Sequence, residues 1–377
     1  MEVRVSELRF IIAGGGTGGH VYPALAIAQG LSEAFEHCRV LYVGTKQGLE
    51  ADIVPRTGLP FQTISAAGFK RRLTARNLWS ATLSFWGAGE AYRLVRAFKP
   101  TVAIGTGGYV SGPVLLAAYL AGVPALIHEQ NAFPGLTNRL LARTARCVAL
   151  TFPEAMRHLP RGARIRVTGL PVREEIRRID REEARARLGA GAETVLLSFG
   201  GSRGARRLNE AMVDVVKAFY GRPGVRIYHA TGSAGYETFT RLLEPDGIDT
   251  MGQGNITIAP YFYNIADHLA AADLVLCRAG AATIAEITCV GRPAVLIPYP
   301  YAADNHQEYN AKALVDREAA VMIRDAQLTG KRLLREVNDL LDAPERLTQM
   351  AKNSARLGKP DALEQIIACV REIGNLG

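Results

Sequence analysis

A glycine-rich turn between a short apolar run and a helical pattern is the feature that most constrains how this chain can fold. The apolar run covers residues 10–13, the turn reads Gly14 to His20 (GGGTGGH), and the helical pattern starts near Pro23. Strand, turn and helix in this order open a nucleotide-binding βαβ unit, because glycine permits a tight turn and lets the backbone approach a ligand closely. Glycine accounts for 38 of the 377 residues, so a structural or functional reason for its clusters is expected.

The same order of strand, turn and helix recurs in both halves of the chain. Further buried strands are predicted at residues 40–43, 102–104, 124–127, 195–199, 226–229, 256–258, 274–277 and 294–297. The segments between them are long enough for crossover helices, which favours parallel sheets covered by helices on both faces. We therefore predict an α/β protein with two doubly wound, Rossmann-like parallel-sheet domains facing a cleft, with ligands at the carboxyl ends of the strands.

The pattern resets near residue 170, where a turn precedes a charged helix predicted over residues 174–188. The turn from Gly200 to Ala205 then repeats the N-terminal one, with Ser202 in the position of Thr17. The expected domains are residues 1–169 and 170–357. Residues 358–377 are expected to form a C-terminal helix that packs back toward the N-terminal domain.

Composition excludes several classes of protein. The most apolar stretch, residues 114–127, contains Gly122 and Pro124 and is shorter than a membrane-spanning helix. No signal peptide precedes the first predicted strand, and the five scattered cysteines lack any C-x-x-C pair, so a cytoplasmic location with free thiols is expected. The net charge of +9 is compatible with phosphate groups, nucleic acid or anionic lipid.

Four glycine turns at predicted strand ends form candidate anion sites. They are Gly14 to Gly19, Gly105 to Gly108, Gly200 to Gly204, and Gly280 to Thr283. Backbone N–H groups that open a helix attract anions, so together such turns can hold a diphosphate. No D-x-D pair is present, and neither a metal site nor a cofactor is expected. Tight turning alone remains the alternative for any single loop.

His20 is the first candidate for a general base. It follows the first turn at a helix start, where the positive helix end favours a neutral imidazole. A capping or packing role is the alternative. His128 and Glu129, followed by Gln130 and Asn131, come at the end of another predicted strand and so are expected at the ligand edge of the sheet. They are the other two candidate bases.

Residues 73–98 predict a long helix with two apolar stripes. The expected core stripe consists of Leu78, Ala81, Phe85, Ala88, Tyr92 and Val95. The second stripe contains Trp79, Leu83 and Trp86, and cations that include Arg72 and Arg76 lie around it. Aromatic side chains ringed by cations suit an anionic membrane interface, so reversible attachment to a membrane is expected. Packing under a neighbouring loop is the alternative.

Several of these motifs together resemble a known family. The segment from Gly15 to Ala24 (GGTGGHVYPA), the segments 105–109, 128–131 and 200–205, and the stretch from Arg278 to Glu286 occur in the order found in the MurG family of GT-B glycosyltransferases. The resemblance implies an inverting, metal-independent enzyme of glycosyltransferase family 28. Such an enzyme moves N-acetylglucosamine (GlcNAc) from UDP-GlcNAc to the C4 hydroxyl of N-acetylmuramic acid in lipid I, the undecaprenyl-pyrophosphoryl pentapeptide precursor of peptidoglycan.

The resemblance also implies roles for individual residues. Thr17, Gly18, Gly19 and Asn131 would contact the donor from the N-terminal domain, and Ser202 would contact its diphosphate. Arg173 and the backbone around Phe262 would flank the uracil, and Gln307 would hold hydroxyls of the transferred sugar. The nucleotide stretch would comprise Ala281, Ala282, Thr283, Ile284, Ala285 and Glu286, with Glu286 on the ribose. Leu170 and Ala279 depart from the family pattern, but neither is a residue on which the mechanism depends.

The resemblance places the chain at the cytoplasmic face of a bacterial plasma membrane, as a peripheral protein of peptidoglycan synthesis and of a cell-wall synthesis complex. A UDP-sugar epimerase of related fold is the nearest alternative. A nicotinamide dehydrogenase is disfavoured because no acidic residue follows the second strand, where Lys46 ends the segment. A nucleic-acid-binding protein would explain the charge but not the glycine turns, so no nucleic-acid partner is expected.

Overall fold

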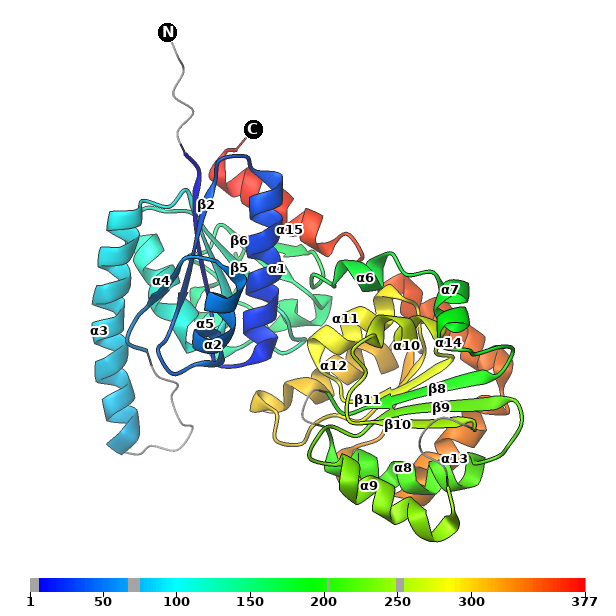
Figure 1. The fold of residues 1–377 in the computed structure, drawn as a ribbon. Coiled ribbons are helices and arrows are strands. Elements are labelled where there is room, and N and C mark those ends of the chain that lie inside the picture. The colour runs from blue at the N-terminus through cyan, green and yellow to red at the C-terminus, as the bar shows by residue number, and fades with distance from the viewer. Residues whose placement is uncertain (1–6, 67–74, 202–203, 249–253, 377) are drawn as a thin grey trace. The chain divides into compact units, whose positions relative to one another are not determined.

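The computed structural model describes residues 7–66, 75–201, 204–248 and 254–376, with the backbone alone for residues 75–85. The chain divides into two compact units (Figure 1). Unit 1 comprises Met1–Pro171 and Asp361–Gly377, and unit 2 comprises Val172–Pro360. The C-terminal helix α15 (Ala362–Gly374) therefore belongs to unit 1.

Unit 1 is built on a sheet of seven parallel strands in the order β3-β2-β1-β4-β5-β6-β7. The strands are β1 (Arg9–Gly14), β2 (Arg39–Gly44), β3 (Phe61–Thr63), β4 (Val102–Gly107), β5 (Ala125–Glu129), β6 (Cys147–Leu150) and β7 (Ile165–Val167). From β1, the strands β2 and β3 follow on one side of the sheet, and the strands β4 to β7 follow on the other side. The strand order therefore reverses between β1 and β4, the position where doubly wound folds bind ligands.

Helices cover both faces of this sheet. On one face α1 (Gly18–Ala34) and α15 pack on alternate side chains of the strands, including Phe10, Ile12 and Tyr42. On the other face α3 (Ala75–Phe98) and α4 (Gly108–Leu120) pack on Ile11 and Ala13. The short elements of unit 1 are α2 (Leu49–Ile53), η1 (Val54–Thr57), α5 (Leu136–Leu141) and η2 (Pro153–His158).

Unit 2 repeats this topology with six parallel strands in the order β10-β9-β8-β11-β12-β13. The strands are β8 (Thr194–Phe199), β9 (Val225–Ala230), β10 (Ile256–Ala259), β11 (Leu274–Cys277), β12 (Ala294–Leu296) and β13 (Ala320–Met322). The order matches that of β3-β2-β1-β4-β5-β6 in unit 1. The strand order of unit 2 accordingly reverses between β8 and β11.

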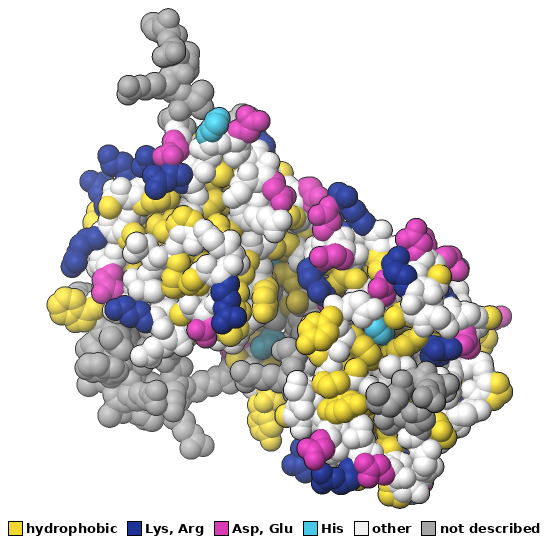
Figure 2. All heavy atoms as spheres, viewed as in Figure 1, with side chains coloured by type: hydrophobic (Ala, Val, Ile, Leu, Met, Phe, Trp, Pro, Cys, Tyr) yellow, Lys and Arg dark blue, Asp and Glu magenta, His cyan; other side chains and the backbone are white. Residues whose placement is uncertain are grey.

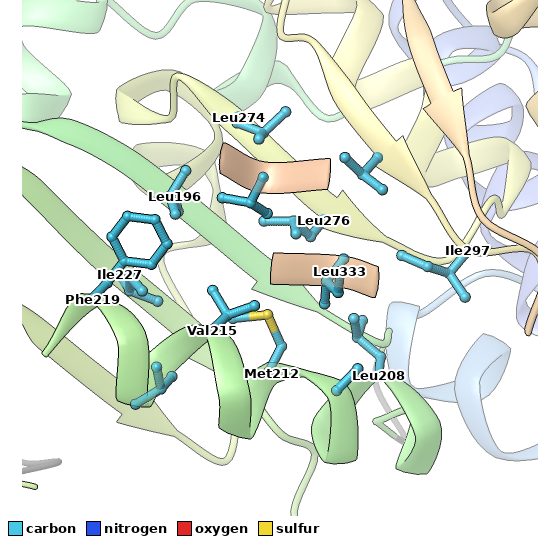
Figure 3. Close-up of a cluster of buried hydrophobic side chains, with 14 of the residues drawn as sticks. Leu196, Leu208, Met212, Val215, Phe219, Ile227, Leu274, Leu276, Ile297 and Leu333 are labelled. Atoms are coloured by element: carbon cyan, nitrogen blue, oxygen red, sulfur yellow. The ribbon is translucent and has the colours of Figure 1, made fainter. Parts of the chain in front are cut away.

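One face of the second sheet carries the core drawn in Figure 3. Leu196, Ile227 and Leu276 point from the strands toward Leu208, Met212 and Val215 of α8 (Arg206–Phe219). The helices α9 (Tyr236–Leu243) and α13 (Gly330–Leu341) close the same core. The remaining elements of unit 2 are α6 (Glu174–Arg177), α7 (Arg181–Arg187), η3 (Glu244–Asp246), α10 (Ile265–Ala271), α11 (Ala281–Cys289), η4 (Ala303–Asn305), α12 (His306–Val315), η5 (Asp325–Gln327) and α14 (Pro344–Leu357).

The predicted fold class of two doubly wound parallel-sheet domains is confirmed. Each predicted strand is present, whereas β3, β6, β7 and β13, each three or four residues long, were not predicted. The helix predicted over residues 174–188 is wrong as a single element. It is divided into α6 and α7, and Asp180 caps α7 by accepting a hydrogen bond from the Glu183 N–H at 2.9 Å.

The predicted core stripe of α3 is also partly wrong. Among the residues whose side chains are described, Ala91 and Val95 are fully buried, whereas Tyr92 is exposed. Gly87 is buried too, and it packs so closely on the backbone of Ser65 that an added Cβ would lie 1.8 Å from the Ser65 carbonyl oxygen. Close backbone packing at Gly87 therefore sets the rotation of the helix. Of the helices that the structure describes, none is both long and apolar enough to cross a bilayer.

Candidate active site

The four glycine turns singled out in the sequence flank the two positions where strand order reverses. In unit 1 they join β1 to α1 and β4 to α4, and in unit 2 they join β8 to α8 and β11 to α11. Two helix N-termini therefore open at each reversal, next to the carboxyl ends of the central strands. This is the arrangement that binds phosphorylated ligands in doubly wound folds.

The two turns of unit 1 pack backbone against backbone. A Cβ on Gly108 would lie 2.2 Å from the Gly15 carbonyl oxygen, and a Cβ on Gly14 would lie 2.1 Å from Thr106 Oγ1. Thr106 is buried and donates its hydroxyl to the His20 carbonyl oxygen at 2.8 Å. Close packing of the backbone therefore requires glycine at these positions, whether or not a ligand binds. A structural role of this kind was the alternative interpretation of a single glycine turn.

Glu50, which was not predicted from the sequence, lies beneath the first turn. Its side chain is fully buried, and its Oε2 accepts a hydrogen bond from the Gly16 N–H at 2.9 Å. Its Oε1 accepts from both the N–H and the hydroxyl of Thr45, at 3.0 and 2.9 Å. A Cβ on Gly15 or Gly48 would lie within 2.6 Å of this carboxylate. The spacing of glycines around residues 44–50 was the signal available in the sequence.

The carboxylate of Glu50 changes the interpretation of the first turn. The Gly16 N–H, which was expected to face an anion, instead donates to Glu50. A buried negative charge beneath the turn also opposes a second anion above it. The turns of unit 2 are therefore better suited to a diphosphate than the Gly14–Gly19 turn.

His20 is the third residue of α1, and its imidazole is half-buried. Nδ1 lies 3.1 Å from the Gly15 carbonyl oxygen and 3.3 Å from Thr17 Oγ1. Because a carbonyl oxygen can only accept, the proton of the neutral ring is assigned to Nδ1, and Nε2 is the proton acceptor. The edge of the ring that carries Nε2 lies against Gly107, where a Cβ would come within 3.0 Å of Nε2. Gly107 therefore keeps space at the basic nitrogen.

His128 and Glu129 lie inside β5, not beyond its end, and both are buried. His128 Nε2 lies 3.0 Å from the Gly169 carbonyl oxygen, its Nδ1 lies 3.0 Å from Gln130 Nε2, and burial lowers the pKa of His128 to about 4. The geometry thus contradicts a role for His128 as base, because both ring nitrogens are engaged within the protein.

Glu129 is similarly committed to the fold. Its Oε1 accepts from the N–H of Asn131 at 2.9 Å and from the Asn131 side chain at 3.3 Å. Its Oε2 accepts from the Gly135 N–H at 3.0 Å and from Asn138 Nδ2 at 2.8 Å. Four donors within the protein therefore occupy the two carboxylate oxygens of Glu129. Glu129 instead holds the loop that carries Asn131.

In unit 2 the structure brings together Arg173 and Glu286, which were assigned to different parts of the nucleotide. Arg173 Nη2 lies 3.2 Å from Glu286 Oε1, and Glu286 is on α11, the helix that opens at the strand reversal. Burial raises the pKa of Glu286, and the neighbouring guanidinium of Arg173 opposes that rise. The pair thus presents a half-exposed cation and a carboxylate side by side.

Two of the predicted contacts can involve only the backbone. Phe262 is buried and its ring stacks on His268 at a centroid distance of 4.1 Å. Ile284 is buried in the interior of unit 2, so a ligand contact through its side chain is excluded. Ala281 and Thr283 are partly exposed and Ala282 is exposed, as expected of residues at the start of α11.

Gln307 stands in the first turn of α12. Its side-chain oxygen accepts a hydrogen bond from the Tyr299 N–H at 2.9 Å, which orients the amide. Asp304 and Asn305, which directly precede α12, both have left-handed backbone conformations, with φ of 53° and 54°. Such conformations in non-glycine residues cost energy and cluster at ligand sites. They went unrecognised in the sequence, although Asn tolerates this conformation better than most residues.

The turn between β8 and α8 requires glycine at two positions. Gly201 and Gly204 have φ of 87° and 73°, and a Cβ on Gly204 would lie 2.1 Å from the Thr231 carbonyl oxygen. Ser202, the predicted diphosphate contact, lies outside the described residues. Within the described part of the chain, no group of three or more His, Cys, Asp or Glu side chains is arranged to hold a metal ion.

Exposed apolar side chains occur on the helices that cover one face of unit 1. They are Trp86 of α3, Tyr119 and Leu120 of α4, and Leu136 and Leu140 of α5, with exposed fractions between 53% and 69%. The same helices and the residues directly after them carry exposed cations at Arg93, Arg96, Lys99 and Arg143. Figure 2 shows hydrophobic side chains among Lys and Arg side chains on the face of unit 1 that it presents. The side chains of Trp79, Leu83, Arg72 and Arg76 lie outside the described residues.

Two family models match the chain. The model of the glycosyltransferase family 28 N-terminal domain matches residues 10–150, and that of the C-terminal domain matches residues 195–366. The first range lies within unit 1, and the second covers most of unit 2 and reaches the first residues of α15.

Similar curated proteins carry one name. A protein of Desulforudis audaxviator (strain MP104C) is 56% identical over 371 residues, which cover 98% of this chain and all of that protein. A protein of Moorella thermoacetica is 52% identical over 364 residues, covering 96% and 98%. Both are named UDP-N-acetylglucosamine–N-acetylmuramyl-(pentapeptide) pyrophosphoryl-undecaprenol N-acetylglucosamine transferase.

Solved structures show the same resemblance. The crystal structure of Acinetobacter baumannii MurG superposes with a TM-score of 0.80 at 31% identity, and covers 97% of this chain and 99% of that one. A putative UDP-N-acetylglucosamine 2-epimerase of Listeria monocytogenes reaches a TM-score of 0.66 at 14% identity, with 97% and 96% covered. The latter likeness shows a shared fold alone.

Proposed function

Because the chain belongs to glycosyltransferase family 28, we propose that it transfers GlcNAc from UDP-GlcNAc to the C4 hydroxyl of N-acetylmuramic acid in lipid I, which yields lipid II for peptidoglycan synthesis. The observation that carries this proposal is the identity of 56% and 52% to transferases of that name over nearly the whole chain. The epimerase alternative rests on fold alone and is not favoured.

We assign the general base to His20. The acceptor hydroxyl attacks C1 of the donor sugar, its proton passes to His20 Nε2, and UDP leaves from the opposite face with the bonding electrons. The tautomer supports this role, since Nδ1 is directed at the Gly15 carbonyl oxygen and Nε2 carries the lone pair. The commitment of His128 and Glu129 to internal hydrogen bonds leaves His20 as the best placed of the three candidates.

The donor nucleotide is assigned to unit 2. Arg173, the backbone at Phe262 and the start of α11 would hold the uridine, with Glu286 on the ribose and Gln307 on the sugar. The N-terminus of α8, reached through Gly201 and Gly204, would face the diphosphate together with Ser202. Helix N-termini stabilise the negative charge that builds up as UDP leaves. Thr17, Gly18, Gly19 and Asn131 remain proposed contacts from unit 1.

The apolar side chains of α3, α4 and α5 in unit 1 are proposed to dock on an anionic membrane at the cytoplasmic face, where the polyprenyl acceptor resides. Two or three buried large side chains give roughly 1.5 to 3 kcal/mol each, and nearby cations about 1 kcal/mol each. This permits reversible attachment. Membership of a cell-wall synthesis complex is likewise proposed from the family.

Vesicle flotation tests the membrane proposal. Vesicles of phosphatidylcholine with and without phosphatidylglycerol are compared for the wild type, a Trp86→Ser/Leu140→Ser double variant and a matched control, Tyr263→Ser, which removes a highly exposed aromatic ring from unit 2. The double variant should lose flotation with phosphatidylglycerol and the control should keep it. Equal flotation of all three proteins would refute this docking surface.

UDP release tests the proposed reaction. The enzyme is incubated with UDP-GlcNAc, with and without a short-chain lipid I analogue, in the presence of EDTA. UDP should appear only with the acceptor and at a rate that EDTA leaves unchanged. A His20→Ala variant should lose about 10² to 10⁴ in rate, whereas Gln29→Ala, an exposed change on the same helix, should not. Acceptor-independent conversion to another UDP-sugar would favour the epimerase instead.

A further inference from the structure

The two ends of a single peptide group connect Glu50 to His20. The peptide between Gly15 and Gly16 presents its N–H to Glu50 Oε2 at 2.9 Å and its carbonyl oxygen to His20 Nδ1 at 3.1 Å. The carboxylate, the peptide and the imidazole therefore form one continuous hydrogen-bonded chain. The proposed function uses His20 but gives no role to Glu50.

The surroundings of Glu50 fix it as an acceptor. Its three described donors are the N–H groups of Gly16 and Thr45 and the Thr45 hydroxyl. These three donors hold both carboxylate oxygens of Glu50 in place. Gly15, Gly44 and Gly48 have no room for a Cβ because the Glu50 side chain fills the space, with separations of 2.6, 2.5 and 2.1 Å. Glycine at these three positions therefore makes room for the Glu50 side chain beneath the turn.

We propose that Glu50 is a positioning residue that orients His20 and strengthens its basicity through the Gly15–Gly16 peptide. The inference rests on the proposed role of His20 as base. A carboxylate that accepts from a peptide N–H polarises the peptide and makes its carbonyl oxygen a better acceptor. That oxygen then holds Nδ1–H more strongly, which fixes Nε2 as the proton acceptor. In Ser-His-Asp triads a carboxylate performs this task by direct contact with the imidazole.

The proton balance of the step is simple. The acceptor hydroxyl gives its proton to His20 Nε2, and the imidazolium keeps the proton on Nδ1 hydrogen-bonded to the Gly15 carbonyl oxygen. No proton passes to the peptide or to Glu50. The carboxylate stabilises the positive charge on the ring at a distance of two hydrogen bonds.

Other titratable groups face this turn from the elements packed around it. From β2, Tyr42 donates its hydroxyl to the Gly14 carbonyl oxygen at 2.8 Å, and burial raises the pKa of Tyr42, so this phenol stays neutral. From α4, the ring of Tyr109 lies against Gly16. From α2, Glu50 supplies the negative charge, and the Gly15–Gly16 peptide connects that charge to the His20 ring.

Nitrogen-15 NMR of the histidine side chains in the full-length wild type gives the first test. A difference spectrum with His20→Asn identifies the His20 signals. The neutral ring should carry its proton on Nδ1, the less common tautomer in solution. A neutral His20 protonated at Nε2 would overturn the proposal without any change to Glu50.

The second test compares Glu50→Gln with Thr45→Val. The first variant keeps the shape of the side chain but removes its charge, and its NH₂ group must face either the Gly16 N–H or the donors of Thr45. The second variant removes one donor to Glu50 while the bond to Gly16 stays. In Glu50→Gln the pKa of His20 should fall by about half a unit or more, because the imidazolium loses a nearby anion. In Thr45→Val it should stay within about 0.2 units of the wild type. Thermal unfolding checks that both variants are folded.

Kinetics separate this proposal from the proposed function. In Glu50→Gln, kcat should fall about 10- to 100-fold, part of what a positioned base supplies, while KM for UDP-GlcNAc stays within twofold. The acidic limb of the pH profile should move to lower pH with the pKa of His20. If the pKa of His20 shifted in Glu50→Gln but the acidic limb of the pH profile did not move, the inference about Glu50 would hold and His20 would not be the base. An unshifted pKa would overturn the Glu50 inference.

Discussion

Replacement of Glu129 by glutamine tests the reassignment of this residue from candidate base to structural anchor. The amide can keep its oxygen toward Asn131, but its NH₂ group then meets the Gly135 N–H and Asn138 Nδ2, which lie 3.0 and 2.8 Å from Oε2. The buried donor of Asn138 and the part-buried N–H of Gly135 lose their acceptor, and the loss of a buried acceptor costs about 1 to 3 kcal/mol. A destabilisation of about 3 kcal/mol lowers the unfolding midpoint of a unit of this size by roughly 6 to 12 °C.

Differential scanning calorimetry of the full-length protein measures this midpoint. The matched control is Glu36→Gln, an identical chemical change at an exposed carboxylate, which should shift the midpoint by less than about 1 °C. If Glu129→Gln left the midpoint unchanged while turnover fell by several orders of magnitude, the carboxylate would act on substrate and our assignment would be wrong.

Further predictions concern unit 2. Glu286→Gln should weaken UDP binding about 5- to 150-fold in calorimetric titration, since a charged hydrogen-bond partner is lost, and unchanged affinity would contradict the ribose assignment. Gly204→Ala should disrupt UDP binding and stability more than Gly201→Ala, because a Cβ at Gly204 meets the Thr231 carbonyl oxygen at 2.1 Å whereas the space at Gly201 is open. Burial lowers the pKa of His229 to about 4, so the unfolded state binds more protons between about pH 4 and 6.5. This contribution to stability is present above pH 6.5 and falls by about 2 kcal/mol as pH drops to 5. The midpoint of His229→Leu should therefore depend less on pH than that of the wild type, and parallel curves would refute the shift.

Much of the fold was predictable because its signals are local. Runs of three to five mostly apolar residues, each followed directly by glycine, marked β1, β2, β4 and β8, and these strands contribute to the cores of both units. The edge strands β3 and β7 were not predicted, since a polar residue, Gln62 or Arg166, stands at the centre of each three-residue strand. The break before Asp180 was hidden by a densely charged segment, although an Asp followed three positions later by Glu is a helix-start pattern.

The location of the candidate site at the glycine turns was predictable from the sequence, but the individual hydrogen bonds within it were less so. The four glycine turns do flank the strand reversals, because topology brings the ends of central strands together. The direction of a single N–H group depends on tertiary packing, so the donation of Gly16 to Glu50 could not be inferred from the turn alone. Similarly, the polar run from His128 to Asn131 gave no sign that its first two members lie inside the sheet.

The stereochemistry at C1 of the transferred sugar is the most direct test of a single displacement assisted by His20. The disaccharide released from the lipid product is analysed by proton NMR, and the coupling constant at C1 is compared with that of UDP-GlcNAc. We predict the opposite configuration at C1 in every product molecule. Retained configuration would require two displacements and a second reacting group, and would contradict direct attack by the acceptor hydroxyl.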